Sequence, residues 1–81
     1  MRNRRKKKAI PKLDLHQVRH EDVRGRCIEF VEANWDTGEE IHIITGYSDM
    51  MMELVIQVLK EYNLRYEEGD YFNRGYIKSW L

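Results

Sequence analysis

An aspartate and a histidine two residues apart are the part of this sequence best suited to chemistry. They lie in the run Leu13-Asp14-Leu15-His16, where apolar and polar residues alternate as in a strand with one buried face. Alternate strand residues share a face, so both leucines are predicted to face a core and both polar side chains the opposite way, with Cα atoms about 6.5 Å apart. A histidine exchanges protons near neutral pH and a carboxylate can orient it, so the pair is suited to act on a phosphate or a water. The alternative is that the pair only holds a loop or a helix end.

A second candidate is the run Thr45-Gly46-Tyr47-Ser48. It lies between a predicted strand and a predicted helix, where unpaired backbone N–H groups can bind an anion. Gly46 allows the backbone to approach a phosphate closely, Ser48 can cap the helix, and Tyr47 can stack on a base. Each also has a structural alternative: a tight turn for the glycine, a plain cap for the serine, and packing against the last strand for the tyrosine.

The hydrophobic pattern predicts the elements that position these residues. The clearest is a helix whose apolar residues recur at helical spacing, namely Met51, Leu54, Val55, Val58, Leu59 and Tyr62. In order we predict a strand over 12–16, a helix over 21–34, a strand over 41–44, a helix over 49–62, and strands over 64–67 and 76–81, the last entered by a turn at 73–75. The fold class is therefore α/β, a two-layer sandwich β-α-β-α-β-β with a four-stranded mixed sheet and two helices on one face.

Such βα units bind ligands at the carboxyl ends of the strands, beside the helix N-termini. Asp14 and His16 end the first predicted strand, and residues 45–48 follow the second. If these strands are neighbours, both loops open onto one site.

Composition limits what kind of protein this is. A length of 81 residues predicts one domain, near the small end of what can bury a core alone. The single cysteine, Cys27, can form no intrachain disulfide, which favours a reducing, cytoplasmic compartment. The basic N-terminus runs into Ala9, Ile10 and Pro11, unlike a secretory signal, and no run reaches the roughly 20 apolar residues of a membrane span. We expect a monomer with no membrane partner.

No catalytic role is predicted for the other two histidines or for the remaining aromatic residues. His20 would oppose the dipole of the first helix if protonated, and His42 lies in an apolar strand, where it is predicted to be structural. The remaining aromatic residues are predicted to fill the core. No metal site or cofactor is predicted, although a divalent cation is left open, because one carboxylate and one imidazole are too small a ligand set to argue for it.

The net charge of zero hides a separation of charge along the chain. Residues 1–12 hold seven of the 14 Lys and Arg residues and no acid, which leaves residues 13–81 with a net charge of −7. A block of basic charge is typical of a nucleic-acid-binding arm, although a solubilising terminus or one folded back on the acidic body are alternatives. We predict a disordered basic arm over 1–12 and a domain over 13–81. The arm residues predicted to contact nucleic acid are Arg2, Arg4, Arg5, Lys6, Lys7 and Lys8.

Over residues 13–81 the sequence resembles the Smr (small MutS-related) domain family. The run 13–16 is similar to that family's Leu-Asp-Leu-His motif, the run 43–48 to its His-Gly-x-Gly loop, and Asn73-Arg74-Gly75 to the glycine-rich turn before its last strand. The resemblance implies a two-layer α/β fold and, in many members, an endonuclease that nicks DNA or cuts RNA, including messenger RNA on stalled ribosomes. It ties Asp14 and His16 to cleavage and Gly46 to nucleic-acid binding.

Three positions depart from the family pattern, and they define the alternative function. Gln17 and Ser48 stand where many members have glycine, and Thr45 stands where most have histidine. The main prediction is an endonuclease in which His16 is the general acid or base, Asp14 orients it, and the loop amides hold the phosphate. The alternative is a catalytically weak or inactive module of the same fold that binds nucleic acid or a ribosome. A protein-interaction domain is a third reading, without a motif behind it.

Overall fold

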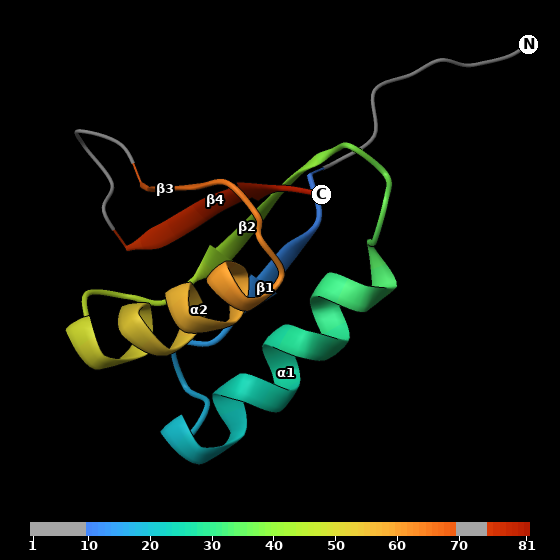
Figure 1. Cartoon of the computed structure of the whole chain (residues 1–81). Coiled ribbons are helices and arrows are strands. Elements are labelled where there is room, and N and C mark those ends of the chain that lie inside the picture. Colours follow the sequence, from blue (N-terminus) through green and yellow to red (C-terminus); the bar gives the residue numbers. More distant parts are fainter. Residues whose placement is uncertain (1–9, 70–74) are drawn as a thin grey trace, which may run out of the picture.

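The computed structural model describes residues 10–69 and 75–81. The predictions for arm residues 2–8 and for the turn residues Asn73 and Arg74 lie outside this part of the chain. The elements are β1 (Lys12–Asp14), α1 (His20–Ala33), β2 (Glu40–Ile44), α2 (Asp49–Glu61), β3 (Tyr66–Glu68) and β4 (Tyr76–Trp80) (Figure 1).

The predicted fold class is confirmed. The four strands form one sheet in the order β1-β2-β4-β3, in which β1 is parallel to β2 and β4 is antiparallel to both of its neighbours. Figure 1 shows α1 and α2 packed together over one face of the sheet. Because β1 and β2 are parallel neighbours, the loops that follow them leave the sheet at the same edge.

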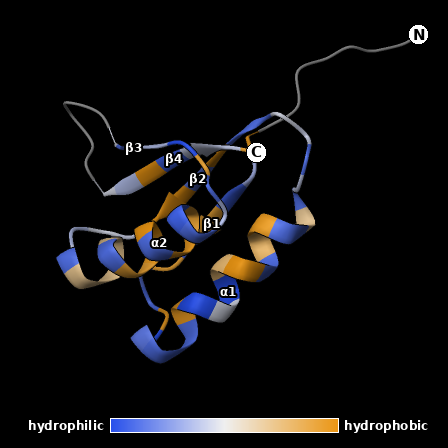
Figure 2. Ribbon diagram, viewed as in Figure 1, coloured by the Kyte–Doolittle hydropathy of each residue, from blue (hydrophilic) through white to orange (hydrophobic). Residues whose placement is uncertain are grey.

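The core lies between the sheet and the helices and is aliphatic. Figure 2 shows hydrophobic residues in the central strands and in both helices, separated by hydrophilic ones. In β2 and β4 burial alternates residue by residue, as expected for strands with one covered face. The buried hydrophobic residues are Leu15, Val23, Cys27, Val31, Ile41, Ile43, Met51, Val55, Val58, Leu59 and Ile77.

The prediction that the remaining aromatic residues fill the core holds only at its margin, where Phe30, Tyr62 and Tyr66 pack against the buried residues. Tyr71 and Phe72 lie outside the residues that the structure describes. Among the residues that the structure describes, none of the fully buried core side chains is aromatic, and Trp35 is 50% exposed. Tyr62 packs at the margin of the core, where its ring contacts Trp35 edge-on at 5.6 Å and its hydroxyl donates to Glu32. Compact aliphatic side chains fill the thin layer between sheet and helices, whereas tyrosine needs a polar neighbour for its hydroxyl.

Two strand boundaries differ from the prediction by two residues, and the others differ by at most one. β1 ends at Asp14 because the N–H of Val18 donates to the carbonyl of Leu15 and turns the chain there. The sheet also begins within the range predicted as an arm, since the carbonyl of Pro11 accepts from the N–H of His42 at 3.0 Å.

The other boundary is at β3, which begins at Tyr66 rather than at Leu64. The N–H of Leu64 instead donates to the carbonyl of Leu59, and Asn63 adopts a φ of 57°, a left-handed conformation that ends α2.

No helix within residues 10–69 and 75–81 combines the length and apolar character needed to cross a bilayer.

The buried thiol allows a direct test of this packing. Cys27 has no exposed surface, and burial raises the pKa of its thiol to about 11. We expect the native protein to resist Ellman's reagent at pH 8 and to release one thiol per chain on addition of urea, since only the thiolate reacts. Complete labelling within seconds under native conditions would contradict the buried position of Cys27.

Candidate active site

The aspartate and histidine singled out in the sequence contact each other. Asp14 Oδ1 accepts a hydrogen bond from the backbone N–H of His16 at 3.1 Å and lies 2.5 Å from His16 Nδ1. Both side chains are about half exposed, at 54% for the aspartate and 53% for the histidine. The side-chain bond to His16, followed by the backbone bond, lowers the pKa of Asp14 below its ordinary value of 3.8.

This contact fixes how the imidazole can exchange a proton. A carboxylate with a lowered pKa is ionised at neutral pH and has no proton to give, so Nδ1 of His16 must be the donor. The opposite nitrogen, Nε2, is then the one that meets a ligand or solvent. Because the folded pKa of Asp14 is lowered, the stabilising contact persists above pH 3.8 and is lost as the pH falls through the lowered value.

The second predicted loop lies directly beside this pair. Gly46 has a φ of +68°, and a Cβ placed on it would lie 3.8 Å from the Cβ of His16. The two loops are brought together by the sheet, because the N–H of Leu15 donates to the carbonyl of Ile44 at 2.8 Å. The predicted meeting of the two loops at one edge of the sheet is therefore confirmed.

The start of α2 adds backbone donors to the same edge. Ser48 caps the helix, since its hydroxyl oxygen accepts from the N–H of Met51 at 3.1 Å. In the described part of the chain no protein acceptor bonds the N–H groups of Tyr47, Asp49 or Met50. Such groups and the positive end of the helix dipole favour a bound anion.

Two of the residues predicted to contact a phosphate, Thr45 and Gly46, are hydrogen-bonded within the protein instead. Thr45 is 2% exposed, and its hydroxyl donates to the carbonyl of Gly46 at 2.8 Å. The N–H groups of Thr45 and Gly46 both donate to the carbonyl of Gly75, each at 2.9 Å. The hydroxyl and N–H of Thr45 and the N–H of Gly46 are thus bonded within the protein, which leaves the N–H groups that follow Gly46 as donors for an anion.

Tyr47 is 75% exposed, so it does not pack against the last strand. It lines a small hollow of about 330 Å³ with Asp49, Met52 and Glu68, where its ring is open to a partner. His20 is exposed at the first residue of α1. His42 lies on the sheet surface, where its Nε2 is 2.6 Å from Glu40 Oε2.

Within residues 10–69 and 75–81, no three His, Cys, Asp or Glu side chains gather in a way that could hold a metal ion.

A scan against protein-family models gives no match to this chain, and searches of curated proteins and of solved structures give none. The likeness to Smr domains thus rests on the motif residues alone.

The unusual backbone at Gly46 leads to a second prediction. Gly46→Ala should lower the free energy of unfolding by about 1–2 kcal/mol, because an L-residue is strained at positive φ. Gly38 is a matched control, with a φ of +72° and nothing within 4 Å of a Cβ placed on it. Urea denaturation should show similar losses for Gly38→Ala and Gly46→Ala, whereas only Gly46→Ala, which adds a methyl beside His16, should change cleavage or nucleic-acid binding. Equal functional effects of the two variants would argue against a role for the Gly46 loop.

Proposed function

We propose that this chain is a nucleic-acid endonuclease of the Smr type, which breaks a phosphodiester bond with Asp14 and His16. The observation that carries the proposal is the position of this hydrogen-bonded pair beside Gly46, at the edge where the loops after β1 and β2 meet. A proton-exchanging group and a set of anion-binding amides are thereby available to one phosphate.

The proposed mechanism follows from the protonation of the pair. With Nδ1 bonded to the carboxylate of Asp14, Nε2 of His16 takes a proton from the attacking hydroxyl as its oxygen bonds to phosphorus. The bond from phosphorus to the leaving oxygen then breaks, and the imidazolium returns the proton to that oxygen. Water as the nucleophile gives hydrolysis, whereas a ribose 2′-hydroxyl gives transesterification and restricts the substrate to RNA.

The remaining parts of the chain fit a nucleic-acid substrate. The N–H groups at the start of α2 would hold the phosphate while negative charge develops on it. The basic arm would supply affinity that does not depend on sequence. A monomer in a reducing cytoplasm is the setting that we propose, with the unpaired Cys27 as its main support.

The test is cleavage of supercoiled DNA and of a structured RNA by the wild type and by Asp14→Ala, with and without EDTA. We expect the wild type to convert one of these substrates and Asp14→Ala to be at least tenfold slower, since the ring of His16 loses the group that orients it. The reactions with EDTA report whether a divalent ion takes part. Equal activity of wild type and variant would contradict the assignment of Asp14.

A binding module of the same fold is the second candidate, and the second loop favours it. Thr45 offers no imidazole and is buried, and the N–H of Gly46 is already bonded to Gly75. Such a module would bind nucleic acid or a ribosome through the same edge without cutting a strand. Salt-dependent binding with no cleavage of DNA or RNA by the wild type would favour this candidate over the nuclease.

A further inference from the structure

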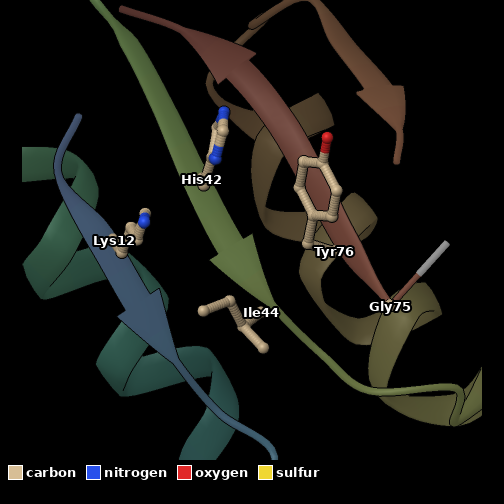
Figure 3. Close-up of a pocket in the computed structure, with 5 residues that line it drawn as sticks. All are labelled: Lys12, His42, Ile44, Gly75 and Tyr76. Atoms are coloured by element: carbon tan, nitrogen blue, oxygen red, sulfur yellow. The ribbon is translucent and has the colours of Figure 1, made fainter. Parts of the chain in front are cut away.

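The face of the sheet opposite the helices carries a hollow that the proposed cleavage site does not use. Figure 3 shows it over three neighbouring strands, with the helices behind them. Its volume is about 330 Å³, near the lower end of ligand pockets, which start at about 300 Å³. The hollow therefore suits one small group rather than a helix or a duplex. It is lined by Lys12, His42, Ile44, Gly75 and Tyr76.

The strand register explains why these side chains meet. Lys12 of β1 is paired with His42 of β2, and Ile44 of β2 is paired with Tyr76 of β4. The alternate residues of β2, Ile41 and Ile43, face the core, so the side chains of His42 and Ile44 point to the open face.

The lining combines a flat aromatic wall, an apolar side chain and a positive charge. The rings of Tyr76 and His42 lie 4.9 Å apart between centroids, with their planes inclined by 38°. His42 is held in place by Glu40, 2.6 Å from its Nε2. Ile44 is half-buried beside them, and Lys12 is exposed on the neighbouring strand (Figure 3).

We infer that this hollow binds an unpaired nucleobase, which stacks on Tyr76 while Lys12 meets the phosphate of the same or the adjoining nucleotide. An aromatic wall beside a cation is the arrangement that binds single-stranded nucleic acid, because every base has a flat π-face. A paired base inside a duplex is stacked between its neighbours and cannot enter a hollow of this size. The inference rests on the proposed function in that it assigns the class of nucleic acid, namely one with an unpaired nucleotide.

The hollow is next to the candidate active site. Ile44, which lines it, is the cross-strand partner of Asp14. Gly75, which also lines it, carries the carbonyl that accepts from the N–H of Gly46. A nucleic-acid strand with one base in the hollow would thus carry its next phosphodiester toward His16. Cleavage would then occur beside an unpaired nucleotide.

The first experiment uses the unmodified full chain and small probes. In a ¹H–¹⁵N and aromatic NMR titration, AMP and UMP should shift the resonances of Lys12, His42, Ile44 and Tyr76 at millimolar concentrations. Ribose 5-phosphate, which has the phosphate but no base, should leave the aromatic resonances of His42 and Tyr76 unchanged. Shifts centred instead on Tyr47, or equal shifts with ribose 5-phosphate, would overturn the inference.

The second experiment measures the contribution of the Tyr76 ring. Fluorescence anisotropy with an unstructured RNA or DNA 12-mer should give Tyr76→Phe an affinity within about twofold of the wild type, because the ring is kept. Tyr76→Ala should bind roughly 5- to 150-fold more weakly, the range for loss of one stacked base. Trp35→Ala is the matched control, since it removes a half-exposed aromatic ring from the helix layer. Circular dichroism checks that each variant is folded.

These outcomes separate the inference from the proposed function. If His16→Ala abolishes cleavage while Tyr76→Ala and Tyr76→Phe both bind like the wild type, the hollow is not a base site and the nuclease proposal stands. If AMP and UMP shift the lining resonances and Tyr76→Ala weakens binding, but no substrate is cut, the base site stands and the nuclease proposal fails. A hollow that takes an aromatic side chain of a protein partner would show none of the nucleotide-dependent shifts, which would also overturn the inference.

Discussion

Replacing His16 with alanine should slow strand cleavage by roughly 10²- to 10⁴-fold, the contribution typical of a positioned general acid or base. The imidazole is oriented by the bond from its Nδ1 to Asp14 and borders Gly46. Because the side chain is 53% exposed, its removal leaves no buried cavity, and the free energy of unfolding should change little. The loss should therefore be found in kcat and not in the amount of folded protein.

His20→Ala is the matched control for this experiment. It removes the same side chain from another exposed position, the first residue of α1. We expect His20→Ala to cleave at the wild-type rate and both variants to bind nucleic acid equally, since neither changes the basic arm. If His16→Ala and His20→Ala cleave equally fast, His16 is not the proton-exchanging group.

Much of the fold could be predicted because its elements carry strong periodic patterns. The helical spacing of Met51, Val55 and Leu59 predicted α2, and all three are buried. The ends of short elements were less predictable, because they depend on backbone bonds that have no signature in composition. The bond from the N–H of Leu64 to the carbonyl of Leu59, for example, delays the start of β3.

The meeting of His16 and Gly46 was predictable because parallel neighbouring strands end at the same edge. The burial of Thr45 was not, since it follows from the carbonyl of Gly75, which is 30 residues away in sequence. The hollow on the open face was not predicted either, because it also depends on contacts between residues far apart in the sequence. His42 and Tyr76 are unremarkable in sequence, and only the register of β2 and β4 places their rings 4.9 Å apart.

Removing residues 1–8 should also have a large effect, but on the affinity for nucleic acid rather than on the rate of strand cleavage. This segment carries six Lys and Arg residues and no acid, whereas residues 13–81 carry a net charge of −7. The body alone should repel a polyanion at long range, so the attraction must come from the arm. Six phosphate contacts would give the wild type a loss of roughly 10³-fold in affinity between 50 and 200 mM salt.

The measurement is anisotropy with a labelled duplex and with a single strand over this range of salt. We expect truncation to reduce affinity at the lowest salt by roughly 10³-fold and to flatten the slope of log K against log salt by up to about 5 for the duplex. A full-length variant with the six basic residues changed to glutamine should behave like the truncation, which separates charge from chain length. The single strand should keep more of its affinity than the duplex in both variants, because only an unpaired base can still use the hollow beside Tyr76. An unchanged affinity after truncation would instead place the contacts with nucleic acid on the folded body.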